Sequence, residues 1–170
     1  MEAEPLEQPS LQDAASLAGQ GGPLVVLDQV TDPHNVGAVL RSAAAFNASA
    51  LIMTRRHSPP LDGALAKAAS GAVEHVPVIL VANLARALDE LAATGISRIG
   101  FEGSAERAFE DTEPGDALAL VFGAEHKGLR RLTAEHCDLL CRLETGGAIR
   151  SLNVSNAAAI ALHWVSCRRR

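Results

Sequence analysis

The chain has 170 residues, of which 48% are hydrophobic and 21% are charged, and its formal net charge at pH 7 is −5. This length and composition are those of one soluble globular domain with a full core. No apolar run approaches the roughly 20 residues that a transmembrane helix needs, and the first residues lack the basic and apolar regions of a secretory signal. A cytoplasmic protein without a membrane partner is therefore expected.

Cysteine usage agrees with a reducing compartment. Cys137, Cys141 and Cys167 form no C-x-x-C pair, and their number is odd. We interpret them as reduced packing residues. No metal site is expected.

The charge is unevenly distributed along the chain. Residues 1–23 contain four acidic residues and no Lys or Arg. Three basic groups could contact phosphate: Arg55-Arg56-His57, Lys127 with Arg130 and Arg131, and Arg168-Arg169-Arg170. Each group taken alone is better explained as solvated surface charge. Strong binding to nucleic-acid phosphates would therefore need help from elsewhere.

The order of predicted elements indicates the fold class. Residues 1–22 are polar and rich in Gly and Pro, which predicts a disordered arm or an interdomain linker. Strands are expected at 24–27, 50–53, 76–81, 96–101, 118–122 and 139–143. Helices are expected at 36–47, 61–70, 84–93, 125–136 and 154–167. This alternation predicts one α/β domain over residues 23–170, with a parallel sheet flanked by helices.

Ligands of such sheets bind beyond the carboxyl ends of the strands. The first expected strand runs into residues 28–35, which contain no glycine, so the G-x-G-x-x-G loop of dinucleotide-binding folds is absent. The GxxxxGK[ST] phosphate loop is absent as well. A nucleotide-dependent α/β enzyme is therefore the weaker alternative.

The first segment whose residues could take part in catalysis or binding is Asp32-Pro-His-Asn-Val-Gly-Ala-Val-Leu-Arg-Ser. Asp32 followed by Pro33 can start a helix. Arg41 lies off the apolar stripe of that helix, so its guanidinium can face outward. Taken alone, the segment is better explained as a helix with a capping Asn35 and a solvated arginine.

The second and third segments also combine strand ends with helix starts. The second segment is Leu-Val-Phe-Gly-Ala-Glu-His-Lys-Gly-Leu. Its Gly123 ends a strand, where backbone can approach a ligand closely, and Glu125 follows shortly after. Ser-Leu-Asn-Val-Ser begins at Ser151 and leads into a helix that is apolar nearly all round. Such a helix is typical of a core or an oligomer interface. Each segment alone is explained by a glycine turn or by helix capping.

In this order, the three segments resemble the motifs of the SpoU-type RNA 2′-O-methyltransferases of the SPOUT superfamily. The resemblance covers roughly residues 24–166. It implies an α/β fold with a C-terminal deep trefoil knot, a homodimer, and S-adenosylmethionine as cofactor. It implies transfer of a methyl group to a ribose 2′-hydroxyl of RNA, with ribosomal RNA and a guanosine of 23S rRNA as the expected target and tRNA as an alternative.

The resemblance also assigns site residues. The family's catalytic motif positions fall on Asn35, Arg41, Glu125, Ser151 and Asn153. Cofactor would be held by backbone groups around Gly123, Leu143 and Leu152. A side chain at position 123 is accordingly expected to abolish cofactor binding.

The same resemblance suggests roles for these side chains. A guanidinium stays protonated at neutral pH, so Arg41 is expected to clamp phosphate and stabilise the forming alkoxide rather than act as a base. Asn35 would position Arg41, Glu125 would brace the second segment, and Ser151 and Asn153 would orient the ribose. Arg41 would reach the cofactor held by the other subunit of the dimer.

Two departures from the family pattern leave an alternative open. Glu144 and Thr145 stand where the family often has Pro and Met, and Arg150 stands where a small residue is common. A non-catalytic knotted module that binds RNA or a partner is therefore the main competing hypothesis. Members of this branch also carry an N-terminal RNA-binding domain, so the chain is expected to represent the catalytic domain alone.

Overall fold

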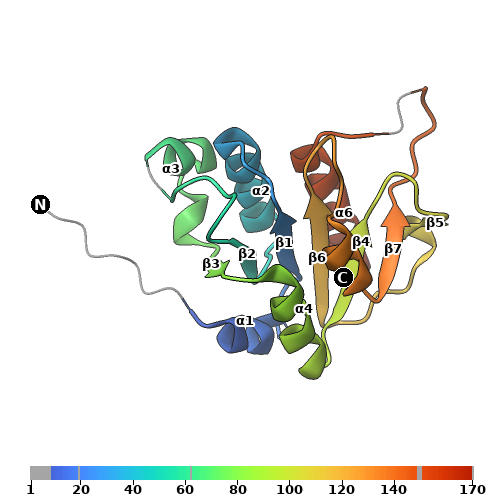
Figure 1. Ribbon diagram of the computed structural model, residues 1–170, viewed down its shortest axis with the longest axis horizontal. Coiled ribbons are helices and arrows are strands. Elements are labelled where there is room, and N and C mark those ends of the chain that lie inside the picture. Colours follow the sequence, from blue (N-terminus) through green and yellow to red (C-terminus); the bar gives the residue numbers. More distant parts are fainter. Residues whose placement is uncertain (1–8, 19, 62, 149–150, 170) are drawn as a thin grey trace, which may run out of the picture.

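The computed structural model describes residues 9–18, 20–61, 63–148 and 151–169. Within this part of the chain, a central sheet of seven strands forms the core of an α/β fold (Figure 1). The strands are β1 (Leu24–Asp28), β2 (Ala50–Thr54), β3 (Val78–Val81), β4 (Ser97–Phe101), β5 (Arg107–Ala108), β6 (Leu118–Gly123) and β7 (Leu139–Arg142). All neighbouring strands pair in parallel, in the order β3-β2-β1-β6-β4-β7-β5. The predicted parallel sheet is confirmed.

Helices cover both faces of this sheet (Figure 1). One face is covered by α2 (Pro33–Ala45), α3 (Gly63–Ala69) and α6 (Val154–Arg168). The other face is covered by α1 (Leu11–Ala18) and α4 (Leu84–Ala93), with the short α5 (Arg131–Glu135) beside α4. Two 3-10 turns, η1 (Ala72–Glu74) and η2 (Phe109–Asp111), complete the elements.

The strand side chains alternate between two apolar cores. In β1, Leu24 and Val26 pack toward α1 and α4, whereas Val25 and Leu27 pack toward α2 and α6. Every residue of β1 and β2 is buried, which explains why these strands are continuously apolar rather than alternating. Each buried Leu or Val contributes about 1.5–3 kcal/mol to folding. None of the described helices is long and apolar enough to cross a membrane.

The prediction of a disordered arm over residues 1–22 is wrong for the segment that forms α1. Ser10 and Asp13 cap this helix reciprocally: Asp13 Oδ2 accepts from Ser10 N at 2.9 Å, and Ser10 Oγ accepts from Asp13 N at 3.1 Å. Ala14 and Ala18 are fully buried against the sheet. The Ser-x-x-Asp spacing is a recognisable helix start, which the polar composition of the region obscured. Residues 1–8 lie outside the described part of the chain.

The helix predicted over 125–136 is much shorter in the structure. Only Arg131–Glu135 are helical. Residues before them form a turn in which Gly128 N donates to Ala124 O at 2.8 Å, with Gly128 at a φ of +63°. A left-handed residue stops a helix from extending back through this segment. The short strand β5 was also not predicted, because two residues carry no periodic signal.

Candidate active site

The first segment places its polar side chains directly above the carboxyl end of β1. Asp32 caps α2, its carboxylate accepting a hydrogen bond from His34 N at 2.9 Å, and Pro33 occupies the first helical position. A proline there lacks an N–H that would be unpaired in any case. Asn35 therefore lies in the first turn of α2, which begins three residues before the predicted helix of residues 36–47.

Side chains from all three segments meet in one cluster, which we call the three-segment cluster: Asn35, Glu125 and Asn153. Asn35 Nδ2 donates to Glu125 Oε1 at 3.1 Å, and Asn153 Nδ2 donates to Asn35 Oδ1 at 3.0 Å. Asn153 Nδ2 also donates to Glu125 Oε1. The Glu125 carboxylate thus accepts from two amides, and charge-assisted hydrogen bonds of this kind are stronger than neutral ones.

The orientation of the Asn153 amide follows from its second role. Asn153 is the N-cap of α6, and its Oδ1 accepts from Ser155 N at 2.8 Å and from Ser155 Oγ at 2.5 Å. Because the oxygen faces the helix, the NH₂ group faces Asn35 and Glu125. The start of α6 and the second segment are therefore fixed relative to one another.

A pocket that encloses about 130 Å³ opens beside the cluster, at the carboxyl ends of β4, β6 and β7. Phe101 and Phe122, with ring centroids 4.6 Å apart and stacked, form part of its lining. The pocket brings together all three predicted cofactor residues and two of the predicted catalytic residues: Gly123, Leu143, Leu152, Glu125 and Ser151.

This pocket has the surfaces that S-adenosylmethionine requires. Leu143, Leu152, Val154 and the two phenylalanines give it an apolar interior suited to a purine ring. The main chain after three strands lines it, and so supplies carbonyl and N–H groups that could bind the edge of the base. Carboxylates at Glu102 and Glu125 on its lining complement a cationic sulfonium or ammonium group. The residues present therefore fit the cofactor.

The backbone of residues 128–129 passes so close to position 123 that only a glycine fits there. A Cβ built at this position would lie 2.1 Å from the carbonyl carbon of Gly128 and 2.4 Å from Leu129 N. The glycine therefore lets the returning backbone of residues 128–129 cross the end of β6. The structure thus gives a reason why Gly123 excludes a side chain that does not involve the cofactor, namely the packing of the second segment on itself. Gly123 also lines the pocket, and contact of the cofactor with its backbone stays a prediction.

Asp28 is a residue of this region that sequence reasoning missed. It ends β1, is fully buried, and accepts from Arg130 N at 2.9 Å and from Arg130 Nε at 2.7 Å. The pair fixes the end of the second segment to the carboxyl end of β1. An acidic residue ending an otherwise apolar strand was the available signal, since a buried carboxylate needs a partner.

The same contact changes the interpretation of the second basic group. Arg130 and Arg131 were treated as phosphate candidates together with Lys127. Arg130 is held by Asp28, and Arg131 Nη1 pairs with Glu135 at 3.1 Å on the surface of α5. Lys127 is exposed.

Arg41 lies apart from the three-segment cluster. It is exposed on α2, and its side chain forms no hydrogen bond or ion pair with any other residue that the structure describes. The expected contact between Asn35 and Arg41 is not formed, because six residues of helix separate them by about 9 Å along the axis and turn them away from each other. Asn35 instead binds Glu125 and Asn153.

The departures from the family pattern leave the pocket lining unchanged where the structure describes them. Glu144 Oε2 pairs with Arg142 Nη2 at 2.9 Å, and its side chain is more than half exposed. Glu144 N points to the carboxylate of Glu110 at 3.3 Å. Neither Glu144 nor Thr145 lines the pocket. Arg150 lies outside the described residues.

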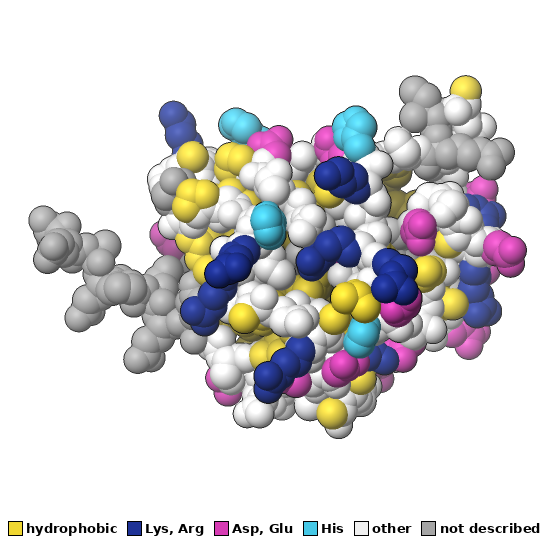
Figure 2. Space-filling view, in the orientation of Figure 1, with side chains coloured by type: hydrophobic (Ala, Val, Ile, Leu, Met, Phe, Trp, Pro, Cys, Tyr) yellow, Lys and Arg dark blue, Asp and Glu magenta, His cyan; other side chains and the backbone are white. Residues whose placement is uncertain are grey.

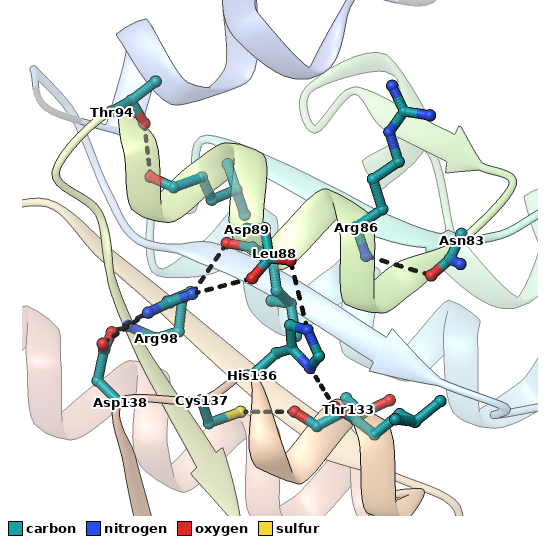
Figure 3. Close-up of polar contacts among 12 residues, drawn as sticks. Asn83, Arg86, Leu88, Asp89, Thr94, Arg98, Thr133, His136, Cys137 and Asp138 are labelled. Atoms are coloured by element: carbon teal, nitrogen blue, oxygen red, sulfur yellow. Dashed lines mark hydrogen bonds and ion pairs between the residues drawn. The ribbon is translucent and has the colours of Figure 1, made fainter.

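A second polar network lies away from this pocket, where α4, β4 and the start of β7 meet (Figure 3). Arg98 forms three hydrogen bonds to the Asp138 carboxylate, from N at 2.8 Å, Nε at 3.0 Å and Nη2 at 2.6 Å, and it approaches Asp89 of α4 at 3.9 Å. The side-chain hydrogen bond from Arg98 lowers the pKa of Asp138 and raises that of Arg98. Burial raises the pKa of the neighbouring Cys137 thiol to about 12. This network joins elements structurally and carries no reactive thiolate.

The described residues contain no cluster of side chains that could bind a metal ion. No three His, Cys, Asp or Glu side chains in this part of the chain are placed to share an ion. The polar groups of the pocket and cluster are suited to binding an organic ligand.

Comparison with known proteins places this arrangement in a family. The profile of the SpoU rRNA methylase family matches residues 22–163. The chain belongs to this family. A 23S rRNA (guanosine-2′-O-)-methyltransferase of Xylella fastidiosa is 46% identical over 156 residues, which cover 92% of this chain and 63% of the relative. The family resemblance of the three sequence segments is thereby confirmed.

Solved SpoU structures have the same fold. The SpoU methyltransferase AviRb of Streptomyces viridochromogenes, in complex with AdoMet, superposes with a TM-score of 0.79 at 26% identity, over 86% of this chain and 60% of that chain. An AdoMet-bound rRNA methyltransferase of Sinorhizobium meliloti superposes with a TM-score of 0.81 at 25% identity, over 92% and 60% of the two chains. The present SpoU chain spans about three fifths of the length of these relatives.

Proposed function

We propose that this chain transfers the methyl group of S-adenosylmethionine to a ribose 2′-hydroxyl of RNA, with a guanosine of 23S rRNA as the target. The observation that carries the proposal is the three-segment cluster at the edge of an apolar pocket, with Glu125 belonging to both. The name of the Xylella fastidiosa relative supports the ribose and ribosomal RNA. A ribosomal RNA target would place the enzyme in the cytoplasm.

Bound S-adenosylmethionine would supply an electrophilic methyl group on a sulfonium sulfur. Residues of the pocket would hold it by apolar contact and main-chain hydrogen bonds, and would exclude water from the methyl group. Ser151 is exposed at the pocket, where its hydroxyl could orient the substrate ribose. The three-segment cluster keeps the two loops of the site in register, which is the condition for alignment of the reacting atoms.

We also propose that the enzyme acts as a homodimer in which Arg41 serves the site of the other subunit. Arg41 is exposed, its side chain forms no hydrogen bond or ion pair with the described residues of its own subunit, and it is absent from the pocket lining. On α6, Ile160 is 45% exposed, although the opposite side of this helix is buried against α2 and β6. A single exposed apolar side chain is ordinary on a protein surface, so the homodimer is proposed from the family resemblance and from the exposed Arg41. From the partner, the Arg41 guanidinium would bind phosphate and stabilise the developing alkoxide, with the proton passing to phosphate or water.

The threading of the chain is a further part of the proposal. Residues that follow β4, β6 and β7 line one pocket with Ser151 and Leu152, which precede α6. The chain beyond β7 therefore folds back against earlier loops. This return supports a trefoil knot of the kind that the family resemblance implies.

The proposal is tested by incubating the purified chain with S-adenosylmethionine labelled in its methyl group and ribosomal RNA from cells that lack the corresponding gene. We expect labelled RNA whose backbone resists alkaline hydrolysis at the modified nucleotide, because a 2′-O-methyl group removes the attacking hydroxyl. Label on a base would contradict the proposed ribose target. Failure of S-adenosylmethionine to bind in calorimetry would favour the non-catalytic module.

A further inference from the structure

The active-site pocket is one end of a longer depression along the carboxyl ends of the strands. A neighbouring hollow, which we call the middle hollow, lies over β1 and shares Ala124 and Glu125 with the pocket. A third, which we call the basic groove, lies over β2 and β3 and shares His57 with the middle hollow. Shared lining residues make the three depressions adjacent, so an extended ligand could occupy all of them.

The basic groove differs from other hollows of the molecule in its charge. Among the residues that the structure describes, its lining contains Arg56, Arg130 and Arg131 and no carboxylate. The hollows near the amino ends of the strands mix Arg residues with acids such as Glu113 and Asp116. In Figure 2, Lys, Arg and His side chains gather across the middle of the viewed face, and carboxylates lie mainly toward its margins. The groove is therefore suited to an anionic ligand.

Two of the three groove arginines are available to such a ligand. The side chain of Arg56 forms no hydrogen bond or ion pair with another described residue and is exposed. Arg131 pairs with Glu135, but its side chain is 82% exposed, and an exposed pair of this kind is worth at most about 1 kcal/mol. A phosphate could replace Glu135 at little cost. Arg130 is held by the buried Asp28 and contributes less.

The loop after β2 is built to present His57 between the two hollows. Buried Thr54 donates from Oγ1 to Arg56 O at 2.5 Å, and Arg55 N donates to Val81 O at 2.9 Å. His57 has a φ of +62°, a left-handed conformation that costs free energy for a residue with a side chain. Surrounding contacts hold the loop in this conformation, and His57 lines both hollows.

An apolar side chain beside these cations indicates a ligand that carries rings as well as charges. Leu132 lines the basic groove and is 54% exposed. Phe101, Phe109 and Phe122 are buried in the core, so they cannot stack on a ligand in this groove. His57 supplies the ring surface, and unpaired bases of RNA commonly stack on His or on apolar side chains.

We propose that the basic groove binds the nucleotides that flank the target ribose in single-stranded RNA. Arg56 and Arg131 bind phosphates, and one base lies against His57 and Leu132. The strand continues through the middle hollow, past Lys127, to the ribose at Glu125. This inference rests on the proposed function, because that function places RNA at the pocket.

The test measures binding of a fluorescein-labelled, single-stranded RNA of mixed sequence to the whole chain across a series of KCl concentrations. Arg56→Ala is compared with Arg107→Ala, which removes the same charge from an exposed residue at the opposite edge of the sheet. His57→Ala is compared with His75→Ala, another exposed histidine. We expect Arg56→Ala to reduce the slope of log affinity against log salt by about 0.7, the value for one single-strand phosphate contact. We expect His57→Ala to weaken binding about fivefold or more, as for loss of a stacked base.

Both control variants should match the wild type, and S-adenosylmethionine affinity should be unchanged in all four. Equal slopes for Arg56→Ala and Arg107→Ala would overturn the groove proposal. If the groove instead binds an acidic protein, Arg56→Ala and His57→Ala should lose affinity for poly-glutamate and keep their affinity for RNA. This result would also overturn the groove proposal. The binding assay needs no turnover, so a chain that binds RNA through the groove and transfers no methyl group would contradict the proposed function alone.

Discussion

The side chains of Asn35 and Asn153, 118 positions apart in the sequence, are joined by a hydrogen bond. Asn153 Nδ2 donates to Asn35 Oδ1 at 3.0 Å. The same Asn153 amide donates to Glu125. Each of these residues alone is explained by helix capping or by a polar turn. Their contact shows that the three SpoU segments form one site, and it suggests variants that separate capping from site assembly.

Substitution of Asn153 separates helix capping from site assembly most clearly. Asn153→Asp keeps an oxygen that can cap α6 at Ser155 N, but it loses the donor to Asn35 and Glu125 and brings a second carboxylate to Glu125. We expect near-normal thermal stability and a fall in methyl-transfer turnover of about tenfold or more. Asn153→Ala should lose turnover and also about 1 kcal/mol of stability through the missing cap. Full turnover in Asn153→Asp would show that the amide donor has no part in the site.

Arg130→Ala should strongly destabilise the fold. It leaves the fully buried Asp28 carboxylate without its side-chain partner, and loss of one member of a buried pair costs about 3 kcal/mol or more. Arg131→Ala, at an 82% exposed neighbour, should change the free energy of unfolding by less than about 1 kcal/mol. Urea denaturation measures both. Adding Asp28→Asn to Arg130→Ala should recover part of the loss, and an additive double variant would show that the two side chains are not coupled.

Gly123→Ala should impair folding and cofactor binding together. The added Cβ would overlap the backbone of Gly128 and Leu129, which must move and take the Glu125 loop with it. We expect a loss of stability of about 3 kcal/mol, at the upper end for overpacked sites. Gly115→Ala is the matched control, since a Cβ there meets nothing within 4 Å. Wild-type stability with lost S-adenosylmethionine affinity would instead support direct contact of the cofactor at Gly123.

The Arg98–Asp138 pair should make stability depend on pH in a defined window. Its hydrogen bonds lower the folded-state pKa of Asp138 below the ordinary value of 3.8. The carboxylate therefore stabilises the fold above that ordinary value, and this contribution disappears as pH falls through the lower folded-state pKa. Asp138→Asn should cost about 1 kcal/mol at neutral pH, allowing for solvent screening, and nothing in strong acid.

Urea denaturation of Asp138→Asn and wild type over a pH series tests this window. Glu90→Gln is the control, because its pair with Arg86 is exposed on the surface of α4. That variant should follow the wild type at every pH. A difference between Asp138→Asn and wild type that stays constant down to strong acid would exclude the ion pair as its cause.

Helices and strands were predicted correctly where the pattern of apolar residues along the sequence is clear. The strands of the sheet were predicted because continuous apolar runs buried on both faces are unmistakable, as in β1. The helix α1 was missed because its buried residues are alanines, which carry little hydrophobic signal. The helix over 125–136 was overextended because its periodicity continues through Gly128, whose left-handed backbone the pattern does not reveal.

The sequence supplied the residues of the candidate site but not their contacts. Asn35, Glu125 and Asn153 were identified through the family resemblance, but their mutual hydrogen bonds depend on packing that no local pattern encodes. The Asp28–Arg130 pair joins residues 102 positions apart and was missed for the same reason. From the family resemblance, Asn35 was expected to position Arg41, but helix geometry turns the two side chains apart within one subunit.

In the proposed dimer, the three-segment cluster of one subunit and Arg41 of its partner make one methyl-transfer site. Mixed dimers of Arg41→Ala and Asn153→Asp test it most directly, with methyl-transfer turnover measured after subunit exchange has been verified by mass spectrometry. Each variant alone should have strongly reduced turnover. In each mixed dimer, one site would contain both defects and the other neither, so we predict about half the turnover of a wild-type dimer. Mixed dimers without turnover would contradict the shared site, because each site would then carry one defect from its own subunit.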